Sequence, residues 1–203
     1  MLTISKNGVL EKAEFDDLAG LEVEPDFEDV VDISHKIALV VPDSVTRIGD
    51  RAFYDKRWLM GITIPGSVLS IGIDAFTDCN YLLSATIADS VTAIGSRAFA
   101  WCESLVSITL PGKVTRLEYR TFYACSSLES IVIPDSITDI GEDVFACCAS
   151  LRSVVLPKSV MSIGDGAFSE CKLLTSVSIM NEAAAVAPDA FSGCGESLVI
   201  RRG

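Results

Sequence analysis

A 23-residue unit repeats along most of the chain and constrains its fold more than any other feature. One regular copy, PDSITDIGEDVFACCASLRSVVL, runs from Pro134 to Leu156. Stacked repeats share one continuous core and contact only their neighbours. We therefore predict a single elongated solenoid for this 203-residue chain. The other copies begin at Pro42, Pro65, Ala88, Pro111 and Pro157, and a degenerate one begins at Met180.

Each position of the repeat predicts part of the path of one coil. Proline at position 1, followed by Asp or Gly, makes a turn that ends the preceding strand. Glycine at position 8 permits a backbone conformation that other residues resist. Ala-Phe at positions 11 and 12 predicts a short helical or 3₁₀ turn, and β-branched residues at positions 21 and 23 predict a strand. Strands of successive coils should form a parallel sheet with a spacing of about 4.8 Å.

The phenylalanine at position 12 is expected to be the main stabilising residue, because burying one such ring contributes about 1.5–3 kcal/mol. Its column consists of Phe53, Phe76, Phe99, Phe122, Phe145, Phe168 and Phe191.

The two ends depart from the repeat. Asn7-Gly8 is a strong hairpin signal, so residues 2–13 are expected to form a hairpin that covers the first coil. Residues 19–41 are interpreted as a degenerate first unit. The expected organisation is therefore an acidic N-terminal cap over 1–41 and seven repeats over 42–203, the last one truncated, within one continuous domain.

Charge is unevenly distributed and excludes some partners. The net charge is -12, which argues against nucleic acid because phosphate binding needs clustered Lys and Arg. Residues 1–41 hold ten acidic residues against three lysines. We interpret this segment as a solvated cap, with a docking site for a basic partner as the alternative. No apolar run approaches the ~20 residues that span a membrane.

The recurring pattern IPDSVTxIGxxAFxxCxxLxSIxI is similar to the leucine-rich repeat of the BspA-like type, which is common in bacteria. The resemblance covers about 42–200 and is clearest at Val91, Ile94, Gly95, Ala98, Phe99, Cys102 and Leu105. It implies an α/β solenoid: a right-handed leucine-rich-repeat horseshoe with a parallel β-sheet, used for protein binding without catalysis. Three local departures are Lys56 for Cys, Glu118 for Gly and Ala88 for Pro.

Cysteine recurs at position 15 of the repeat. We expect a buried thiol at each bend, hydrogen-bonded to the backbone, with metal binding as the alternative. Cys147 stands at a variable position and is expected to be exposed and reactive. Free thiols fit a reducing compartment. The column consists of Cys79, Cys102, Cys125, Cys148, Cys171 and Cys194.

Enzymatic activity is not expected. His35 is the only histidine and is interpreted as a cap residue, and no nucleophile, zinc-protease or phosphate-loop motif is present. The sequence therefore predicts no catalytic residue, no metal and no cofactor.

Two groups of variable residues are candidates for protein binding. The Tyr and Trp residues all occur in copies one to four; they either shield the rim of the phenylalanine turn or form a binding patch. Position 19 is apolar in the first three coils and would lie on the sheet face. The candidates are Tyr54, Trp58, Tyr81, Trp101, Tyr119 and Tyr123 in the first group, and Met60, Leu83 and Val106 in the second.

These observations favour a non-enzymatic protein-protein interaction module with an unidentified protein partner. The alternative is a cell-surface adhesin that binds host or matrix proteins, if an export signal was removed. A structural homo-oligomer is a third class. The start MLTISKNGVLEKAEF lacks the unbroken apolar stretch of a signal peptide, which predicts a cytoplasmic protein if Met1 is the natural start.

Overall fold

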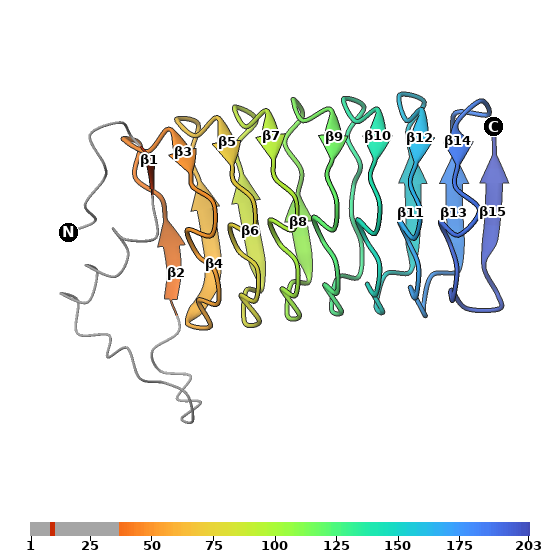
Figure 1. Ribbon diagram of the computed structural model, residues 1–203, viewed down its shortest axis with the longest axis horizontal. Helices are drawn as coiled ribbons and strands as arrows, with labels where there is room; N and C mark the ends of the chain where they lie inside the picture. Colours follow the sequence, from red (N-terminus) through yellow and green to blue (C-terminus); the bar gives the residue numbers. More distant parts are fainter. Residues whose placement is uncertain (1–8, 11–36) are drawn as a thin grey trace.

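The computed structural model describes residues 9–10 and 37–203, and over this range the chain forms a row of stacked coils (Figure 1). Every pair of strands is parallel. The strands fall into two columns, one near the start of each coil and one at its close. The short-strand column contains β1 (Val9–Leu10), β3 (Arg47–Ile48), β5 (Ser70–Ile71), β7 (Ala93–Ile94), β9 (Arg116–Leu117), β10 (Asp139–Ile140), β12 (Ser162–Ile163) and β14 (Ala185–Val186). The closing-strand column contains β2 (Ile37–Val40), β4 (Leu59–Ile64), β6 (Ser84–Ile87), β8 (Ser107–Thr109), β11 (Ser153–Leu156), β13 (Ser176–Ile179) and β15 (Val199–Arg202).

The register of the strands follows the repeat. Ser153 lies opposite Ser176, and Ile71 lies opposite Ile94, so equivalent residues of neighbouring coils are direct partners. This pairing confirms the predicted parallel-strand solenoid. The right-handed, horseshoe-like path remains an expectation from the family resemblance.

The segment around each Ala-Phe pair is a non-helical turn. The described residues contain no α-helix or 3₁₀-helix, so the predicted helical turns, and with them the α/β class, are not found. The physical reason is backbone handedness: positions 10 and 14, Arg51 and Asp55 in the first coil, both have φ of 57°. A right-handed helix cannot pass through left-handed residues.

The turn amides bond to the next coil instead. The amides of Arg51, Phe53 and Asp55 donate to the carbonyls of the second coil at 2.7–2.9 Å. All three bonds recur at the next four junctions between coils, and two of them, from Phe168 and Glu170, recur at the last. We call this column of hydrogen bonds the turn ladder.

Beneath the turn ladder lies the core. The phenylalanine rings stack nearly parallel, with centroids 4.8 Å apart for Phe53 and Phe76 and 5.6 Å apart for Phe99 and Phe122. All are fully buried except the partly buried Phe191. The column thus confirms the predicted inward position of every ring from the first to the sixth coil.

The cysteine thiols link each coil to the one before it. Cys79 Sγ donates to the carbonyl of Phe53 at 2.9 Å, and the same bond recurs five times at 3.1–3.3 Å. Burial raises the pKa of the Cys79 thiol to about 12, so the thiol keeps its proton and can donate it. The expectation of buried thiols bonded to the backbone is confirmed at this position.

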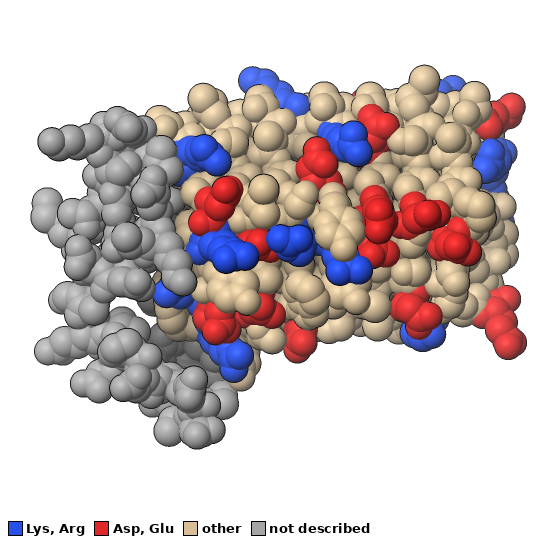
Figure 2. All heavy atoms as spheres, in the orientation of Figure 1, with Lys and Arg blue, Asp and Glu red and all other residues tan. Residues whose placement is uncertain are grey.

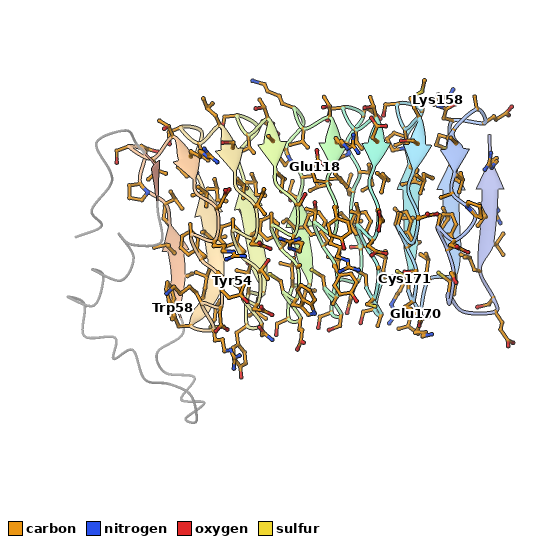
Figure 3. All side chains as sticks on the ribbon, viewed as in Figure 1. Tyr54, Trp58, Glu118, Lys158, Glu170 and Cys171 are labelled. Carbon is orange, nitrogen blue, oxygen red and sulfur yellow. The ribbon has the colours of Figure 1, made fainter. Side chains whose placement is uncertain are left out.

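Both strand columns are divided at the fourth coil. No ladder joins β7 to β9, and between β8 and β11 there are only the isolated bridges Thr109–Val132 and Ser130–Ser153. The division on the short-strand side coincides with Glu118, which replaces the glycine of position 8 beside β9 (Figure 3).

The glycine column shows why a side chain at position 8 matters. A Cβ added to Gly95 would lie 2.7 Å from the backbone of Gly72 in the coil before it. A Cβ alone does not divide the ladder, because Ala187 carries one at the same position of the last coil and β14 still pairs with β12. Glu118 has a longer, charged side chain at this position, and within the described range no bond of its amide to the third coil is found. The turn ladder continues across this junction, so the departure leaves the solenoid intact.

The N-terminal predictions lie mostly outside the described residues. Neither the full hairpin over 2–13 nor His35 is among them. Val9–Leu10 pairs in parallel with β3, and β2 pairs with β4, so described strands cover the outer edges of the first full coil. The described part of the chain contains no helix able to cross a membrane.

Replacing Phe122 by Ala should lower the free energy of unfolding by about 3–5 kcal/mol, because it leaves a cavity in the middle of the ring column. Phe191→Ala, at the partly buried end of the column, should cost less. Thermal or urea unfolding measures both, and an unchanged midpoint for Phe122→Ala would contradict the assignment of the core.

Replacing Glu118 by Gly should raise the free energy of unfolding by roughly 1 kcal/mol, since restored ladder bonds outweigh the backbone entropy of glycine. Glu118→Ala is the matched control, because it removes the carboxylate but keeps a Cβ, as Ala187 does beside an intact ladder. If neither variant gains stability, the side chain of Glu118 does not divide the ladder.

Candidate functional site

Two outer surfaces carry the variable residues of the repeat. The turn face consists of the exposed side chains of residues 50–55 and their equivalents in later coils. The sheet face consists of the exposed side chains of the closing strands and of the residue before each strand. Charged side chains gather in a row across one side of the solenoid, with acidic residues toward its C-terminal end (Figure 2).

The structure divides the six predicted aromatic residues into two groups. Tyr54, Trp101, Tyr119 and Tyr123 belong to the turn face, whereas Trp58 and Tyr81 follow the turn and lead into the closing strand. Trp58 packs partly against the core. Figure 3 shows Tyr54 and Trp58 at the N-terminal end of the array.

Three turn-face aromatic residues and one arginine form a cluster. The rings of Trp101 and Tyr123 meet edge to face with centroids 5.0 Å apart. The Arg120 guanidinium lies 4.8 Å from the ring centroid of Tyr119 and 4.7 Å from that of Tyr123. Arg120 also donates two hydrogen bonds to Asp143, at 2.9 and 3.0 Å. These side chains are therefore held in fixed positions.

A hollow of about 390 Å³ opens beside this cluster, and we call it the Tyr54–Trp101 slot. Asp74, whose side chain is 6% exposed, accepts hydrogen bonds from Arg97 Nε at 2.7 Å and Nη2 at 2.9 Å. Arg51 approaches the same carboxylate at 3.5 Å. The slot is lined by Arg51, Tyr54, Asp74, Thr77, Asp78, Arg97 and Trp101.

Neighbouring charges shift two pKa values in the slot. The hydrogen bond from Arg97 lowers the pKa of Asp74, and the positive charges of Arg97 and Arg51 act in the same direction. The negative charge of Asp78 and a hydrogen bond to it raise the pKa of Tyr54. At neutral pH the Asp74 carboxylate is therefore ionised and the Tyr54 phenol keeps its proton.

Sequence reasoning identified the aromatic residues of the slot and missed its charged ones. The missed signal is an alternation at position 10: Arg51, Asp74 and Arg97 occupy it in successive coils, and Arg120 and Asp143 repeat the pair farther along. Equivalent positions of stacked coils are neighbours, so opposite charges 23 residues apart predict an ion pair.

The sheet face carries exposed apolar side chains on successive coils. Leu83 and Val106 are exposed, as predicted from their position in the repeat, while Met60 is partly buried. Val132 and Val155 stand at position 22 of the next two coils and are 81% and 58% exposed, while position 19 of those coils is charged. The serine column of position 20 lies between the two apolar pairs, is mostly exposed and keeps the surface flat.

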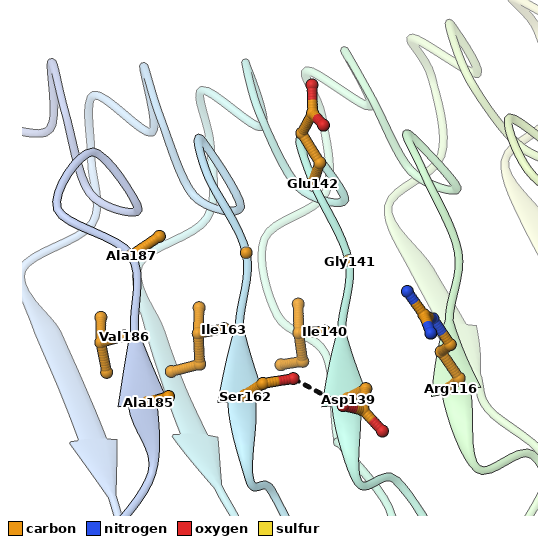
Figure 4. Close-up of a pocket in the computed structure, with 11 residues that line it drawn as sticks. Arg116, Asp139, Ile140, Gly141, Glu142, Ser162, Ile163, Ala185, Val186 and Ala187 are labelled. Atoms are coloured by element: carbon orange, nitrogen blue, oxygen red, sulfur yellow. Dashed lines mark hydrogen bonds between the residues drawn. The ribbon is translucent and has the colours of Figure 1, made fainter.

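A second hollow, of about 400 Å³, lies over the short strands of the last four coils (Figure 4). Asp139 accepts a hydrogen bond from Ser162 Oγ at 2.6 Å, and this bond is the main reason why the pKa of Asp139 is lowered. Arg116 and Glu142 stand at its rim, and small residues form much of the rest. It contains no aromatic side chain.

The seven cysteines are all free. Cys147 is partly exposed beside Tyr123, unlike the buried thiols of the first five column positions. Within the described ranges, no group of three or more His, Cys, Asp or Glu side chains is placed to hold a metal ion.

Asp74→Asn should lower the free energy of unfolding by about 1–3 kcal/mol at pH 7, because Arg97 loses its ionised partner. Asn accepts the left-handed backbone of this position, where φ is 55°. Because the folded-state pKa of Asp74 is lowered, its contribution is complete above the ordinary value of about 4 and disappears as the pH falls through the folded value.

The measurement is the difference in unfolding free energy between wild type and Asp74→Asn from about pH 7 to pH 3. Asp135→Asn, at an exposed turn, serves as the control. A difference that stays constant over this range would contradict the ion pair.

The repeats of this chain are similar to those of known proteins. A family model described as the BspA type leucine rich repeat region matches residues 34–87 and 71–197, with six copies. No curated protein matches the chain.

Three solved structures are similar to the chain. The Treponema pallidum leucine-rich repeat protein is 34% identical, with a TM-score of 0.68, over 71% of this chain and 70% of that one. A leucine-rich repeat protein from Eubacterium ventriosum is 28% identical, with a TM-score of 0.72, over 80% of this chain but 43% of its own length. One from Bacteroides ovatus, at 22% identity and a TM-score of 0.56 over 82% and 60% of the two chains, shows the fold alone.

Proposed function

The chain belongs to the BspA-type leucine-rich repeat family, and from this premise we propose that it is a non-enzymatic protein-interaction module. Its repeats provide a scaffold, since the side chains at the constant positions are buried in the core. Partner recognition must then come from the variable, exposed positions.

Exposed apolar side chains on four successive coils of the sheet face carry this proposal. Leu83 and Val106 stand at position 19 of the second and third coils, and Val132 and Val155 stand at position 22 of the fourth and fifth. An isolated exposed apolar residue is ordinary, but such residues on four neighbouring coils of one sheet favour a protein contact. The small serine side chains between them would let a partner approach closely.

The aromatic residues are a second proposed contact surface. Tyr119 and Tyr123 flank Arg120, Trp101 packs against Tyr123, and Tyr, Trp and Arg are the side chains that most often dominate binding energy. The partly exposed Trp58 and Tyr81 belong to the same proposal, whereas the partly buried Met60 belongs to the sheet face.

We place the module in a reducing compartment, because seven free cysteines in one chain are typical of such an environment. The alternative is an exported adhesin, which would use the same sheet face for a host or matrix protein.

A sheet-face variant tests the proposal. We expect Leu83→Ser combined with Val106→Thr and Val132→Thr to weaken capture of partner proteins from a lysate of the source cells by at least tenfold, because truncating central contacts costs more than about 1.4 kcal/mol. Quantitative mass spectrometry of the bound proteins is the readout.

The matched control is Leu69→Ser with Met161→Ser, which removes exposed apolar side chains away from the sheet face. Both variants should keep the wild-type thermal midpoint. The same bound proteins recovered equally by wild type, variant and control would show that the sheet face is not the interaction surface.

A further inference from the structure

The Tyr54–Trp101 slot is built from three successive coils. Tyr54 comes from the first coil, Thr77 from the same repeat position in the second, and Trp101 from the third. Stacked coils are about 5 Å apart, as the ring spacings of 4.8 and 4.9 Å show. Thr77 is buried, and the side chains of Tyr54 and Trp101 line the hollow from the first and the third coil.

The charges that line the slot cancel. Arg51 and Arg97 contribute two positive charges, and Asp74 and Asp78 contribute two negative ones. A free ion of either sign would meet a like charge, so no charged ligand is favoured. Hydrogen-bond donors and acceptors nevertheless lie side by side in the slot. This arrangement suits a ligand whose groups can both donate and accept hydrogen bonds. A hydroxyl group is such a group.

The polar groups of the slot are fixed before any ligand enters. Arg97 uses Nε and Nη2 on Asp74, so its Nη1 is left for a ligand. The hydroxyl of Thr77 donates to the carbonyl of Arg97 at 2.6 Å. Because these side chains are already ordered, a ligand loses less free energy in ordering them.

The two aromatic side chains supply apolar surface. Tyr54 is 37% exposed, and the Arg51 guanidinium lies 5.9 Å from its ring centroid. Trp101 is partly exposed and is held by its contact with Tyr123. A slot of this kind suits a flat ligand with an apolar face and a rim of hydroxyl groups.

We propose that the Tyr54–Trp101 slot binds a neutral pyranose sugar. The C–H face of the sugar ring would pack on Trp101 or Tyr54, and its hydroxyl groups would bond with Arg97 and Asp78. The hollow of about 390 Å³ falls within the range of small-ligand sites. This binding goes beyond the proposed protein interaction: it uses none of the sheet-face residues, and it shares Trp101 with the second proposed contact surface.

Saturation-transfer NMR tests the proposal with the methyl glycosides of glucose, galactose, mannose and N-acetylglucosamine. At least one glycoside should receive saturation on its ring protons, with a Kd in the millimolar range that is usual for weak ligands. Trp101→Asn and Asp78→Asn should each weaken its binding more than tenfold. Asn is chosen because both positions have positive φ, of 56° and 63°.

The matched control is Asp55→Asn, which changes the same repeat position in the first coil, where the carboxylate pairs with Arg57 instead. It should bind the glycoside like wild type, and so should the sheet-face triple variant. If Trp101→Asn lowers the thermal midpoint, Tyr54→Ala provides the second test at a more exposed position.

Three results would overturn the proposal. The first is that none of the glycosides binds wild type. The second is that Trp101→Asn or Tyr54→Ala, together with Asp78→Asn, binds the glycoside as well as wild type does. The third is that Nα-acetyl-arginine amide binds in place of the sugars, which would make the slot a site for basic side chains of a protein.

Discussion

The stacking of one coil on the next at about 5 Å is the constraint on which the rest of this structure depends. The phenylalanine rings set this spacing in the core, at 4.8 to 5.6 Å. The hydrogen bonds of the turn ladder and of the cysteine thiols maintain the same spacing between the turns of successive coils. Glycine at position 8 follows from it, since a Cβ there meets the backbone of the neighbouring coil. The sheet ladders are less essential, because both are divided at the fourth coil while the array continues.

Much of this architecture could be predicted because each constant residue has the same surroundings in every coil. The rings, thiols and strands were predicted in this way. The turn was not predicted, because Arg51 and Asp55 have a left-handed backbone although neither is glycine. The residue types at these positions therefore do not indicate the conformation. The slot could not be predicted for another reason. It is formed by Tyr54, Thr77 and Trp101 from three neighbouring coils, and no single copy of the repeat contains it.

Function in such an array rests on the positions that differ between coils. Apolar variation on the sheet face favours a protein contact, whereas aromatic and charged variation on the turn face creates a small hollow with fixed polar groups. The same stacking positions both surfaces, so a change in spacing at one junction would alter each of them. The fourth coil is an instance, since the ladder is divided at Glu118, which directly precedes Tyr119 and Arg120 of the aromatic cluster.

Native-state hydrogen exchange tests most directly whether the turn is the continuous support of the solenoid. The informative junction lies between the third and fourth coils, where the amides of Phe99 and Trp101 donate to the carbonyls of Thr121 and Tyr123. We predict that these amides exchange as slowly as that of Phe53, by global unfolding, while the amide of Glu118 exchanges far faster by local opening. Exchange of Phe99 and Trp101 as fast as that of Glu118 would contradict the account.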